Sequence, residues 1–374
     1  MSRRKEHGSG SDGSQQAGGH SLSEILSQPE CWSACLTHLQ GGGLLEKVRD
    51  RFGDIGEWVF VGCGSSYYVA LCAAATMTRW GGVPARALPA SEVLLYPDLV
   101  LPKSGKYVPV LISRSGQTSE VLKAAEFFKT RSIPTLAISC AEGQALEKIA
   151  SFTITLPAAD EKSTVMTRSF TSMLLALQNL AALLGRNSDG RFLTGISEAA
   201  RPFLPTLPAK IRDFVERRQF ADYVCLGQGP FYGLACEYAL KVTEMSVSYS
   251  QVFHTLEFRH GPKSIVSPDT LLIFLISDGG GSSEIDVLDE IKSLGGTTMV
   301  VTNRSNDRVV AAADLLIELA IDAPELSRLA LCLVPGQLLG LYTGLKKGLD
   351  PDSPRNLSRA VILGDTSDSQ HATF

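Results

Sequence analysis

Residues 57–66 read EWVFVGCGSS, and residues 222–231 read DYVCLGQGPF. Each stretch is a short β-rich run that ends in a glycine and leads through a Gly-x-Gly turn into a helical segment. When the sequence is shifted by 165 residues, Gly62, Gly64, Tyr67, Ala70 and Ala74 fall on Gly227, Gly229, Tyr232, Ala235 and Ala239. An internal repeat of this length indicates that one fold occurs twice in the chain.

Short β-rich runs alternate with helical segments in both halves. The β-rich runs cover 57–62, 107–113, 134–139, 152–156, 222–227, 271–277, 297–302 and 314–319, with helices near 65–80, 118–130 and 165–185. This alternation favours parallel sheets covered by helices on both faces. We therefore predict two tandem doubly wound α/β domains, 21–190 and 191–374, after a disordered Gly- and Ser-rich tail at 1–20. The helical stretch 191–219 would carry the crossing between the two copies.

Composition excludes several classes of protein. The 374 residues include 35 Lys and Arg against 39 Asp and Glu, and a net charge of −4 disfavours a nucleic-acid binder. The longest apolar stretches, such as 271–277, are too short to span a bilayer. Eight cysteines without a CxxC pair, and no apolar signal region, favour reduced thiols in a cytoplasmic protein. No residue spacing implies a metal or an organic cofactor.

The stretch 113–120, SRSGQTSE, directly follows a predicted strand and precedes a predicted helix. The hydroxyls of Ser113, Ser115 and Thr118 would converge there with the free backbone amides of the helix start. Such a place suits a phosphate monoester, which accepts many hydrogen bonds and favours the positive helix end. A simple helix cap would need one hydroxyl, and three favour phosphate binding.

The repeat provides an internal control for this loop. A shift of 164 places Arg114 on Asp278 and Ser115 on Gly279, and the aspartate would repel a phosphate. Only the first copy is therefore expected to bind one. The Gly62-Cys63-Gly64 turn has Tyr67 where a dinucleotide fingerprint has its third glycine, so a nicotinamide cofactor is disfavoured. Ser66, at the next helix start, can add a donor to the phosphate.

A charged cluster lies on the helix that opens the second copy. Glu237, Lys241 and Glu244 share one helix face at spacings of four and three residues. A solvated surface pair is the common cause of such spacing, but the surrounding sequence is rich in apolar residues. Carboxylates partly buried beside an ammonium are candidates for acid–base work.

Two further segments are candidates for chemistry. His260 precedes a Gly-Pro turn, which favours a loop, and histidine is suited to proton transfer near neutral pH; a structural loop histidine is the alternative, and His254 competes for the role. Residues 352–359, DSPRNLSR, read as a polar C-terminal loop before a strand-like AVIL at 360–363.

These motifs, in this order, resemble the tandem sugar isomerase (SIS) domain family. GCGSS, SRSGQTSE, ALKVTEMS, FRHGPKS and DPDSPRNLSR carry the resemblance, which covers roughly residues 22–365. The chain is similar to the isomerase half of glutamine–fructose-6-phosphate aminotransferases and to galactosamine- and glucosamine-6-phosphate deaminase/isomerases. The resemblance implies flavodoxin-like domains, a phosphosugar substrate and a homodimer with a shared active site.

The resemblance also implies roles for individual residues. The phosphate would be held by Ser66, Ser113, Ser115 and Thr118, with Arg114 and Gln117 beside it, and Thr164 and Glu161 would border the sugar. Glu244 would move a proton between C1 and C2, Glu237 and Lys241 occupy active-site positions, and His260 would open the ring across a dimer interface.

Two departures from the family pattern shape the expected reaction. Ser2 opens a tail with no room for a glutaminase domain, so glutamine-dependent amination is not expected. Arg359 stands where the aminotransferases have a Schiff-base lysine, and arginine stays protonated and forms no imine. The expected reaction is therefore ammonia release from an aminohexose 6-phosphate. Aldose–ketose isomerisation, deglycation of an amine-linked fructose 6-phosphate, and a non-catalytic sugar-phosphate sensor remain alternatives.

Overall fold

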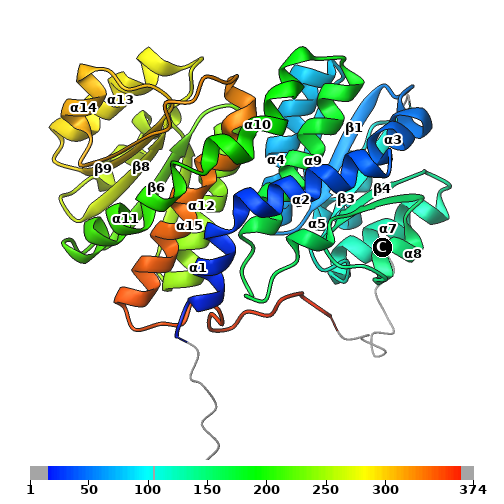
Figure 1. The fold of residues 1–374 in the computed structure, drawn as a ribbon, viewed down its shortest axis with the longest axis horizontal. Helices are drawn as coiled ribbons and strands as arrows, with labels where there is room; N and C mark the ends of the chain where they lie inside the picture. Colours follow the sequence, from blue (N-terminus) through cyan, green and yellow to red (C-terminus); the bar gives the residue numbers. More distant parts are fainter. Residues whose placement is uncertain (1–15, 104–105, 364–374) are drawn as a thin grey trace, which may run out of the picture.

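The computed structural model describes residues 16–103 and 106–363. There the chain forms two five-stranded parallel sheets with helices packed on them, one sheet in each half of the molecule (Figure 1). The strand orders are β2-β1-β3-β4-β5 and β10-β9-β8-β6-β7. Starting from β7, the second order repeats the first, and both match the flavodoxin-like doubly wound arrangement. The predicted fold class and the internal repeat are confirmed.

The element bounds follow the predicted alternation closely. The strands are β1 (Glu57–Gly62), β2 (Ala85–Pro89), β3 (Tyr107–Ile112), β4 (Leu136–Ser139), β5 (Phe152–Thr155), β6 (Asp222–Gly227), β7 (Ser250–His254), β8 (Thr270–Leu275), β9 (Thr297–Thr302) and β10 (Leu315–Glu318). The first-half helices are α1 (Gly19–Leu26), α2 (Gln28–Gly41), α3 (Leu44–Phe52), α4 (Ser65–Thr76), α5 (Ala90–Leu95), α6 (Pro97–Val100), α7 (Ser119–Thr130), α8 (Ala145–Ile149) and α9 (Arg168–Leu184). The second-half helices are α10 (Arg191–Ala200), α11 (Leu207–Glu216), α12 (Pro230–Ser246), α13 (Gly281–Ser293), α14 (Asp307–Ala312) and α15 (Leu329–Lys346).

Burial explains which strands the sequence revealed. β8 and β9 are buried along their whole length, as expected for parallel strands covered on both faces. The edge strands β2 and β7 are partly exposed, have no continuous apolar run, and were not predicted. The expected strand character of 360–363 is wrong: this segment has no regular structure, because only single hydrogen bonds join it to Ser119 at the start of α7.

The turn after the first strand has the same geometry in both copies. A Cβ on Gly62 would lie 2.6 Å from the backbone of Ser66, and one on Gly227 would lie 2.4 Å from the carbonyl oxygen of Phe231. Only glycine therefore allows the helix to start this close to the strand end. Both turns aim a helix N-terminus at the carboxyl edge of a sheet.

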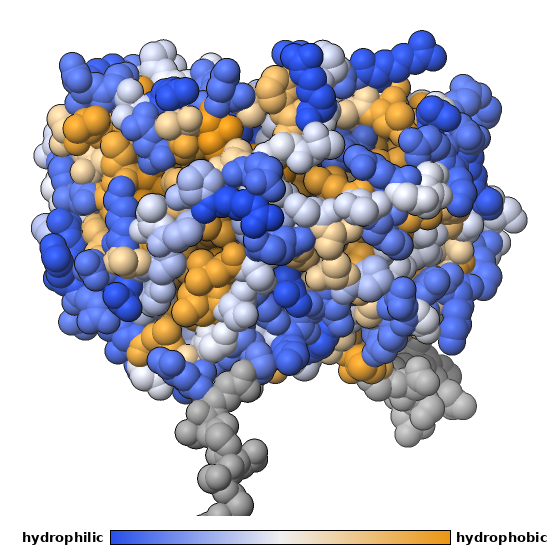
Figure 2. Space-filling view, in the orientation of Figure 1, coloured by the Kyte–Doolittle hydropathy of each residue, from blue (hydrophilic) through white to orange (hydrophobic). Residues whose placement is uncertain are grey.

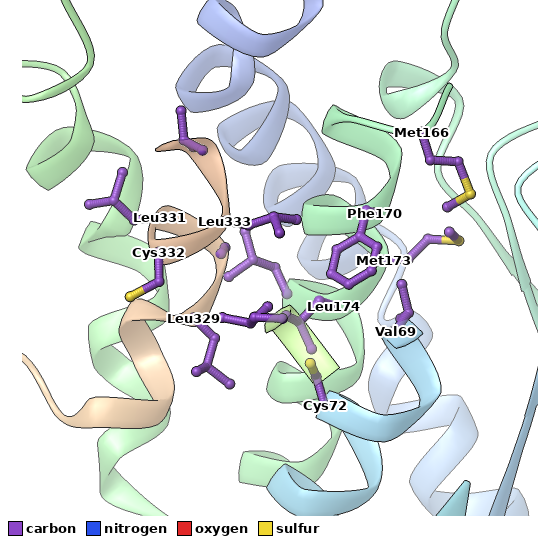
Figure 3. Close-up of a cluster of buried hydrophobic side chains, with 14 of the residues drawn as sticks. Val69, Cys72, Met166, Phe170, Met173, Leu174, Leu329, Leu331, Cys332 and Leu333 are labelled. Carbon is purple, nitrogen blue, oxygen red and sulfur yellow. The ribbon is translucent and has the colours of Figure 1, made fainter. Parts of the chain in front are cut away.

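The core between the two sheets is built from helices of both halves. Figure 3 shows side chains from α4, α9 and α15 meeting in this core. They include Val69, Cys72, Phe170, Met173, Leu174, Leu329, Leu331, Cys332 and Leu333. All eight cysteines are free, and all but Cys63 are buried.

α15 corrects the expectation about apolar stretches. The segment Glu325–Lys346 is long and apolar enough to cross a membrane, although its glycines, Pro335 and Gln337 interrupt the apolar run in the sequence. Its most apolar window is 89% buried inside the protein, which is typical of a core helix. The surface in Figure 2 is mostly hydrophilic, with hydrophobic residues in patches rather than in a belt.

Glycines on α15 bring it against α12. A Cβ on Gly340 would lie 2.7 Å from the carbonyl oxygen of Lys241, and one on Gly344 would lie 2.1 Å from that of Met245. Gly336 faces the Tyr238 ring in the same way, at 2.5 Å. The spacing of four residues puts the three glycines on one face of α15, so α12 is held tightly on this side.

The first helix is tied to the end of the described chain. The N–H groups of His20 and Ser21 donate to the Asp352 carboxylate at 2.9 and 2.7 Å, and Gly18 N–H donates to Asp350 at 2.9 Å. These carboxylates cap α1, which therefore begins at Gly19, inside the predicted tail of residues 1–20. Residues 1–15 of that predicted tail lie outside the described residues.

The boundary between 190 and 191 stays a prediction. The 3₁₀ turn Ser188–Gly190 precedes it, and α10 follows it directly. α10 packs against α2 in the first half, while α11 packs against α15 in the second half. The single helical stretch expected at 191–219 is thus two helices, which carry the chain from one sheet to the other.

Replacing Gly340 by alanine should destabilise the protein by about 1–3 kcal/mol, because the new Cβ would press on the backbone of α12. Gly195→Ala in α10 is the matched control: nothing lies within 4 Å of its Cβ position, so the change should be neutral or stabilising. Urea unfolding of both variants measures the difference. Equal free energies of unfolding would show that the α12–α15 contact tolerates the added methyl group.

Candidate active site

Two candidate segments meet at the carboxyl edge of the first sheet. Ser65 and Ser66 start α4 directly after β1, and residues 113–118 link β3 to α7. β1 and β3 are adjacent strands, and the chain leaves them toward opposite faces of the sheet. Open α/β sheets bind ligands at such a switch point. The structure thus brings Ser66 and the Ser/Thr loop to the same edge.

The loop 113–118 keeps its hydroxyl groups close together. Ser113 Oγ and Thr118 Oγ1 lie 3.1 Å apart, and Ser115 Oγ accepts a hydrogen bond from Gln117 N–H at 3.2 Å. Thr118 makes no capping bond to α7. Its hydroxyl is therefore not used as a helix cap, which was the simpler interpretation of this sequence. Gly116, at φ +63°, supplies the left-handed turn.

A cavity of about 440 Å³ opens beside this loop. Ser115 and Gln117 line one side, and the C-terminal residues Ser358 and Arg359 line another. Asp160 also lines it and forms an ion pair with Arg359. The C-terminal loop, placed by sequence only at the end of the chain, therefore lies over the first sheet. The red segment in Figure 1 follows this path from α15 toward α7 and α8.

The charged cluster of α12 is buried, not solvated. The side chains of Glu237 and Lys241 are 0% exposed, and that of Glu244 is 19% exposed. Lys241 Nζ lies 3.2 Å from Glu237 Oε1 and also forms an ion pair with Glu244. Ser65 Oγ donates to Glu237 at 3.0 Å, so the cluster contacts the start of α4. This overturns the interpretation as a surface ion pair.

Burial tunes the protonation of this cluster. It raises the pKa of Glu237 to about 7, although Lys241 acts in the opposite direction. Burial alone would lower the pKa of Lys241, but the carboxylates of Glu237 and Glu244 outweigh it and raise that pKa. Lys241 therefore stays an ammonium beside a carboxyl group that titrates near neutral pH. Among the described groups, Glu237 Oε2 has no hydrogen-bond partner.

The repeat shows that only one side of the domain interface carries these charges. α4 and α12 pack on each other and are equivalent under the 165-residue shift. This shift places Cys72, Thr76 and Arg79 on Glu237, Lys241 and Glu244, and it places Ser65 on Pro230. Ser65 contacts Glu237 on one side of the interface. The equivalent pair on the other side is Pro230 and Cys72, where Cys72 Sγ lies 3.5 Å from the carbonyl oxygen of Pro230. That side has no carboxylate–ammonium set.

The loop of the second copy is filled by its own helix. The Glu284 carboxylate accepts hydrogen bonds from Ser277 N–H at 2.9 Å and Ser277 Oγ at 2.8 Å. Asp278 adds a second negative charge and pairs with Arg328. A phosphate would have to displace Glu284 against this charge. The structure thus supplies a physical basis for the expectation that only the first copy binds an anion.

His260 belongs to a different segment of the chain from the α12 cluster. It is exposed on the loop after β7, and its backbone N–H donates to the carbonyl oxygen of Glu257 at 3.0 Å. Within the described residues, no hydrogen bond or ion pair joins its ring to Glu244. His254, the competing candidate, stacks on Tyr232 with ring centroids 3.8 Å apart, and its Nδ1 is buried without a described partner.

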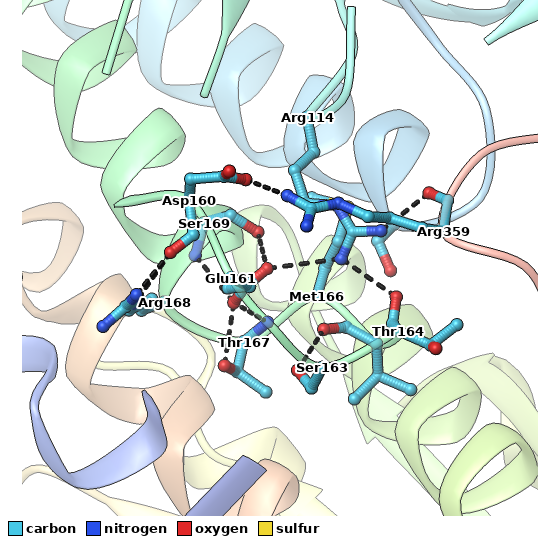
Figure 4. A network of polar contacts seen from close by, with 12 residues as sticks. Arg114, Asp160, Glu161, Ser163, Thr164, Met166, Thr167, Arg168, Ser169 and Arg359 are labelled. Carbon is cyan, nitrogen blue, oxygen red and sulfur yellow. Dashed lines mark hydrogen bonds and ion pairs between the residues drawn. The ribbon is translucent and has the colours of Figure 1, made fainter. Parts of the chain in front are cut away.

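A buried polar network joins the remaining candidates (Figure 4). Glu161 is 2% exposed and accepts hydrogen bonds from the N–H and hydroxyl groups of Thr167 and Ser169. Arg114 is also buried, and its guanidinium donates to Glu161 and to the carbonyl oxygens of Thr164 and Arg359. Arg114 was expected beside the phosphate, but these partners occupy it on the side of the 160–167 loop. Gln117 bonds instead to Gln144 on the surface.

Sequence reasoning missed Asp160, Ser65 and the caps Asp350 and Asp352. Asp160 and Ser65 adjoin residues that were named, but nothing in a single sequence identifies a partner about 200 or 172 positions away. The DPDSPR motif was singled out without a role for its aspartates. A search for carboxylates that could cap a distant helix would have singled out Asp350 and Asp352.

The raised pKa of Glu237 predicts a pH dependence of stability. The folded protein holds this proton more tightly than the unfolded chain, where the ordinary pKa is 4.5. The stability contributed by the group is complete below about pH 4.5 and is lost as the pH rises through about 7. Glu237→Gln, which stays neutral, should flatten the free energy of unfolding between about pH 5 and pH 7.5. An unchanged pH profile in chemical denaturation would contradict this assignment.

Comparison with known proteins identifies relatives over most of this chain. A glutamine–fructose-6-phosphate aminotransferase [isomerizing] of Tropheryma whipplei (strain TW08/27) is 27% identical over 363 residues, which covers 91% of this chain and 58% of that protein. The Pyrococcus horikoshii protein of that name is 28% identical over 359 residues, 91% of this chain and 57% of its own length. The chain thus spans less than two thirds of these curated relatives.

Solved structures show the same fold. Glucosamine-6-phosphate deaminase from Thermotoga maritima has 30% identity and a TM-score of 0.73, covering 92% of this chain and 100% of its own. Tagatose-6-phosphate ketose/aldose isomerase from Escherichia coli has a TM-score of 0.81 at 22% identity, covering 93% and 97%. The SIS domain model matches residues 54–183 and 223–338, one match in each half. The chain therefore belongs to the SIS domain family, with two copies of the domain in tandem.

Proposed function

We propose that this chain is a phosphosugar isomerase that releases ammonia from an aminohexose 6-phosphate. The observation that carries the proposal is the buried Glu237–Lys241 pair, with the partly exposed Glu244 beside it, at the start of α4. Ser66 and the Ser/Thr loop lie at the same edge of the sheet. A phosphate site and an acid–base set next to each other are what such a reaction requires.

The proposed phosphate site is the edge formed by Ser66, Ser113, Ser115 and Thr118. These hydroxyls, together with backbone amides at the starts of α4 and α7, would donate hydrogen bonds to the phosphate oxygens. Because the phosphate is remote from the reacting carbons, its binding energy can hold C1 and C2 in place. In the second copy the Glu284 carboxylate accepts hydrogen bonds from Ser277, and this favours the first copy as the site.

Glu244 is the proposed base and acid. Its partial exposure lets it reach a substrate, whereas Glu237 and Lys241 are completely buried. In the ring-opened amino aldehyde it would take the C2 proton, giving an enolamine, and return the proton to C1. Water then adds to the resulting C2 imine, and ammonia leaves to give the ketohexose 6-phosphate. Lys241 holds the Glu244 carboxylate in position.

His260 is the proposed group for ring opening. It is exposed, and within the described residues no hydrogen bond or ion pair joins its ring to Glu244, so we propose a homodimer in which a second copy supplies it to the site. Arg359 borders the cavity, and we propose that Arg359 and Thr164 face the substrate. We place the protein in the cytoplasm because its thiols are all free.

Two other functions use the same residues. An aldose–ketose isomerase or a fructosamine-6-phosphate deglycase needs the same proton transfer and differs only in the leaving group. A sensor would need the phosphate site alone, and the buried acid–base set favours an enzyme over a sensor. The deciding assay incubates the chain with glucosamine or galactosamine 6-phosphate, without glutamine, and measures ammonia and ketose phosphate. Ammonia from either sugar supports the proposal, and binding without ammonia refutes the deaminase.

Glu244→Gln should lower kcat by a factor of about 10² to 10⁴, because general acid–base catalysis contributes an effect of this size. The affinity for the sugar phosphate, measured by calorimetry, should stay within about threefold of the wild type, since the phosphate site is intact. Arg79→Gln is the matched control, because Arg79 is the equivalent of Glu244 on the other side of the interface. Full activity of the Glu244→Gln variant would remove Glu244 from the mechanism.

The double change Ser113→Ala and Thr118→Ala should weaken inorganic phosphate binding at least about tenfold, since hydrogen bonds to a charged group contribute about 1.5–3 kcal/mol each. Ser282→Ala, at the position equivalent to Thr118, should leave the affinity unchanged. Calorimetric titration with phosphate should give one site per chain. A second phosphate site per chain, or loss of phosphate binding in the Ser282→Ala variant, would place anion binding in the second copy.

A further inference from the structure

The guanidinium of Arg114 joins three segments that are far apart in the sequence. Its Nη1 donates to the carbonyl oxygen of Thr164 at 2.9 Å and lies 3.4 Å from Glu161 Oε2. Its Nη2 donates to the carbonyl oxygen of Arg359 at 2.7 Å. Arg114 itself belongs to the Ser/Thr loop. One side chain thus links the loop after β3, the loop 160–167 and the C-terminal segment (Figure 4).

These bonds leave Arg114 poorly placed to bind a phosphate. The residue is only 4% exposed, and its partner Glu161 is buried in the same network. If the guanidinium turned to a ligand, it would leave the buried carboxylate and two backbone carbonyls without this donor. An unpaired buried charge is costly, so the observed arrangement is strongly favoured.

The second copy offers a natural comparison. Asp278 occupies the position of Arg114, and it pairs with Arg328, which lies 164 residues after Thr164. Both copies therefore join the same two loops by an ion pair, with the charges reversed. A carboxylate only accepts hydrogen bonds, so Asp278 cannot bind a backbone carbonyl as Arg114 does. The loop-to-loop ion pair occurs in both copies, whereas the bond to Arg359 is specific to the first copy.

The C-terminal segment reaches the site through a short series of backbone contacts. Thr164 N–H donates to the carbonyl oxygen of Asp352 at 3.0 Å, and Ser119 N–H donates to that of Val361 at 3.1 Å. Leu363 N–H donates in turn to Ser119 Oγ at 2.9 Å. Within the described residues, the segment from Asp352 to Val361 also receives a hydrogen bond from a buried charged side chain, that of Arg114 to the carbonyl oxygen of Arg359. It fixes the segment where it forms a wall of the 440 Å³ cavity.

We propose that Arg114 is a positioning residue that holds the C-terminal segment over the site and does not bind the phosphate itself. The substrate contacts made by Ser358 and Arg359 then depend on Arg114, although it touches no substrate. The part of this inference that concerns turnover rests on the proposed function. The part that concerns the C-terminal segment does not.

The experiment compares Arg114→Gln and Arg114→Lys with Asp278→Asn in the full chain. Asp278→Asn weakens the equivalent pair in the second copy and is the matched control. Hydrogen exchange of the peptide covering 357–363 should be at least about tenfold faster in Arg114→Gln, unchanged in Asp278→Asn, and intermediate in Arg114→Lys, because lysine offers a single point charge. Calorimetry with inorganic phosphate should give a dissociation constant within about threefold of the wild type for all three.

The kinetic constants distinguish a positioning role of Arg114 from a purely structural one. With the substrate found by the ammonia assay, kcat/KM of Arg114→Gln should fall on the order of 10²-fold, since misplacement by about 1 Å has an effect of this size. The Arg114→Lys variant should have a kcat/KM between those of Arg114→Gln and the wild type. If Arg114→Gln lost phosphate binding while hydrogen exchange at 357–363 stayed unchanged, the proposal would be overturned. Arg114 would then be a phosphate ligand.

The role of Arg114 can be decided even if the proposed function is wrong or one variant does not fold. If no sugar phosphate is turned over, hydrogen exchange and phosphate binding still decide the role of Arg114. If Arg114→Gln fails to fold, Arg114→Lys and the wild type remain. In the wild type, the amides of Ser119 and Leu363 should be protected against exchange, and rapid exchange there would overturn the proposal.

Discussion

The packing of α12 between α4 and α15 is the constraint on which the site depends. Three glycines of α15 bring its backbone against Tyr238, Lys241 and Met245, and α4 closes the opposite side. Water is therefore excluded from Glu237 and Lys241, and neither charge could be buried without the other. Ser65 supplies the remaining hydrogen bond. The resulting low-dielectric pair holds Glu244 at the edge of the solvent, where we propose that it meets the substrate.

The two copies share a fold but differ in charge, and this difference places the site. At the domain interface, one side carries Glu237, Lys241 and Glu244, and the other carries Cys72, Thr76 and Arg79. At the sheet edge, the hydroxyls of Ser113, Ser115 and Thr118 bond within their own loop, and the second loop is filled by Glu284. The scaffold thus occurs twice in the chain, and the side chains favour one copy for the proposed site.

Contacts between distant segments complete the architecture. Asp350 and Asp352 cap the first helix, and Arg114 and Ser119 hold the segment that follows. The N-terminal helix, the Ser/Thr loop and the C-terminal segment are therefore one connected unit. This connection explains why the polar DPDSPR stretch lies at the site, when its composition alone indicated an ordinary loop.

The sequence by itself determined the repeat, the parallel α/β fold, the Ser/Thr loop and the shared face of Glu237, Lys241 and Glu244. These features depend on local periodicity and on spacing along the chain, which a single sequence contains. The tertiary structure decided what depends on distant partners: the burial of the α12 charges, the orientation of Arg114 toward Glu161, the edge strands β2 and β7, and the path of residues 352–363. Burial and hydrogen bonding are properties of neighbours in space, and neighbours far apart in the sequence leave no periodic signal in the chain.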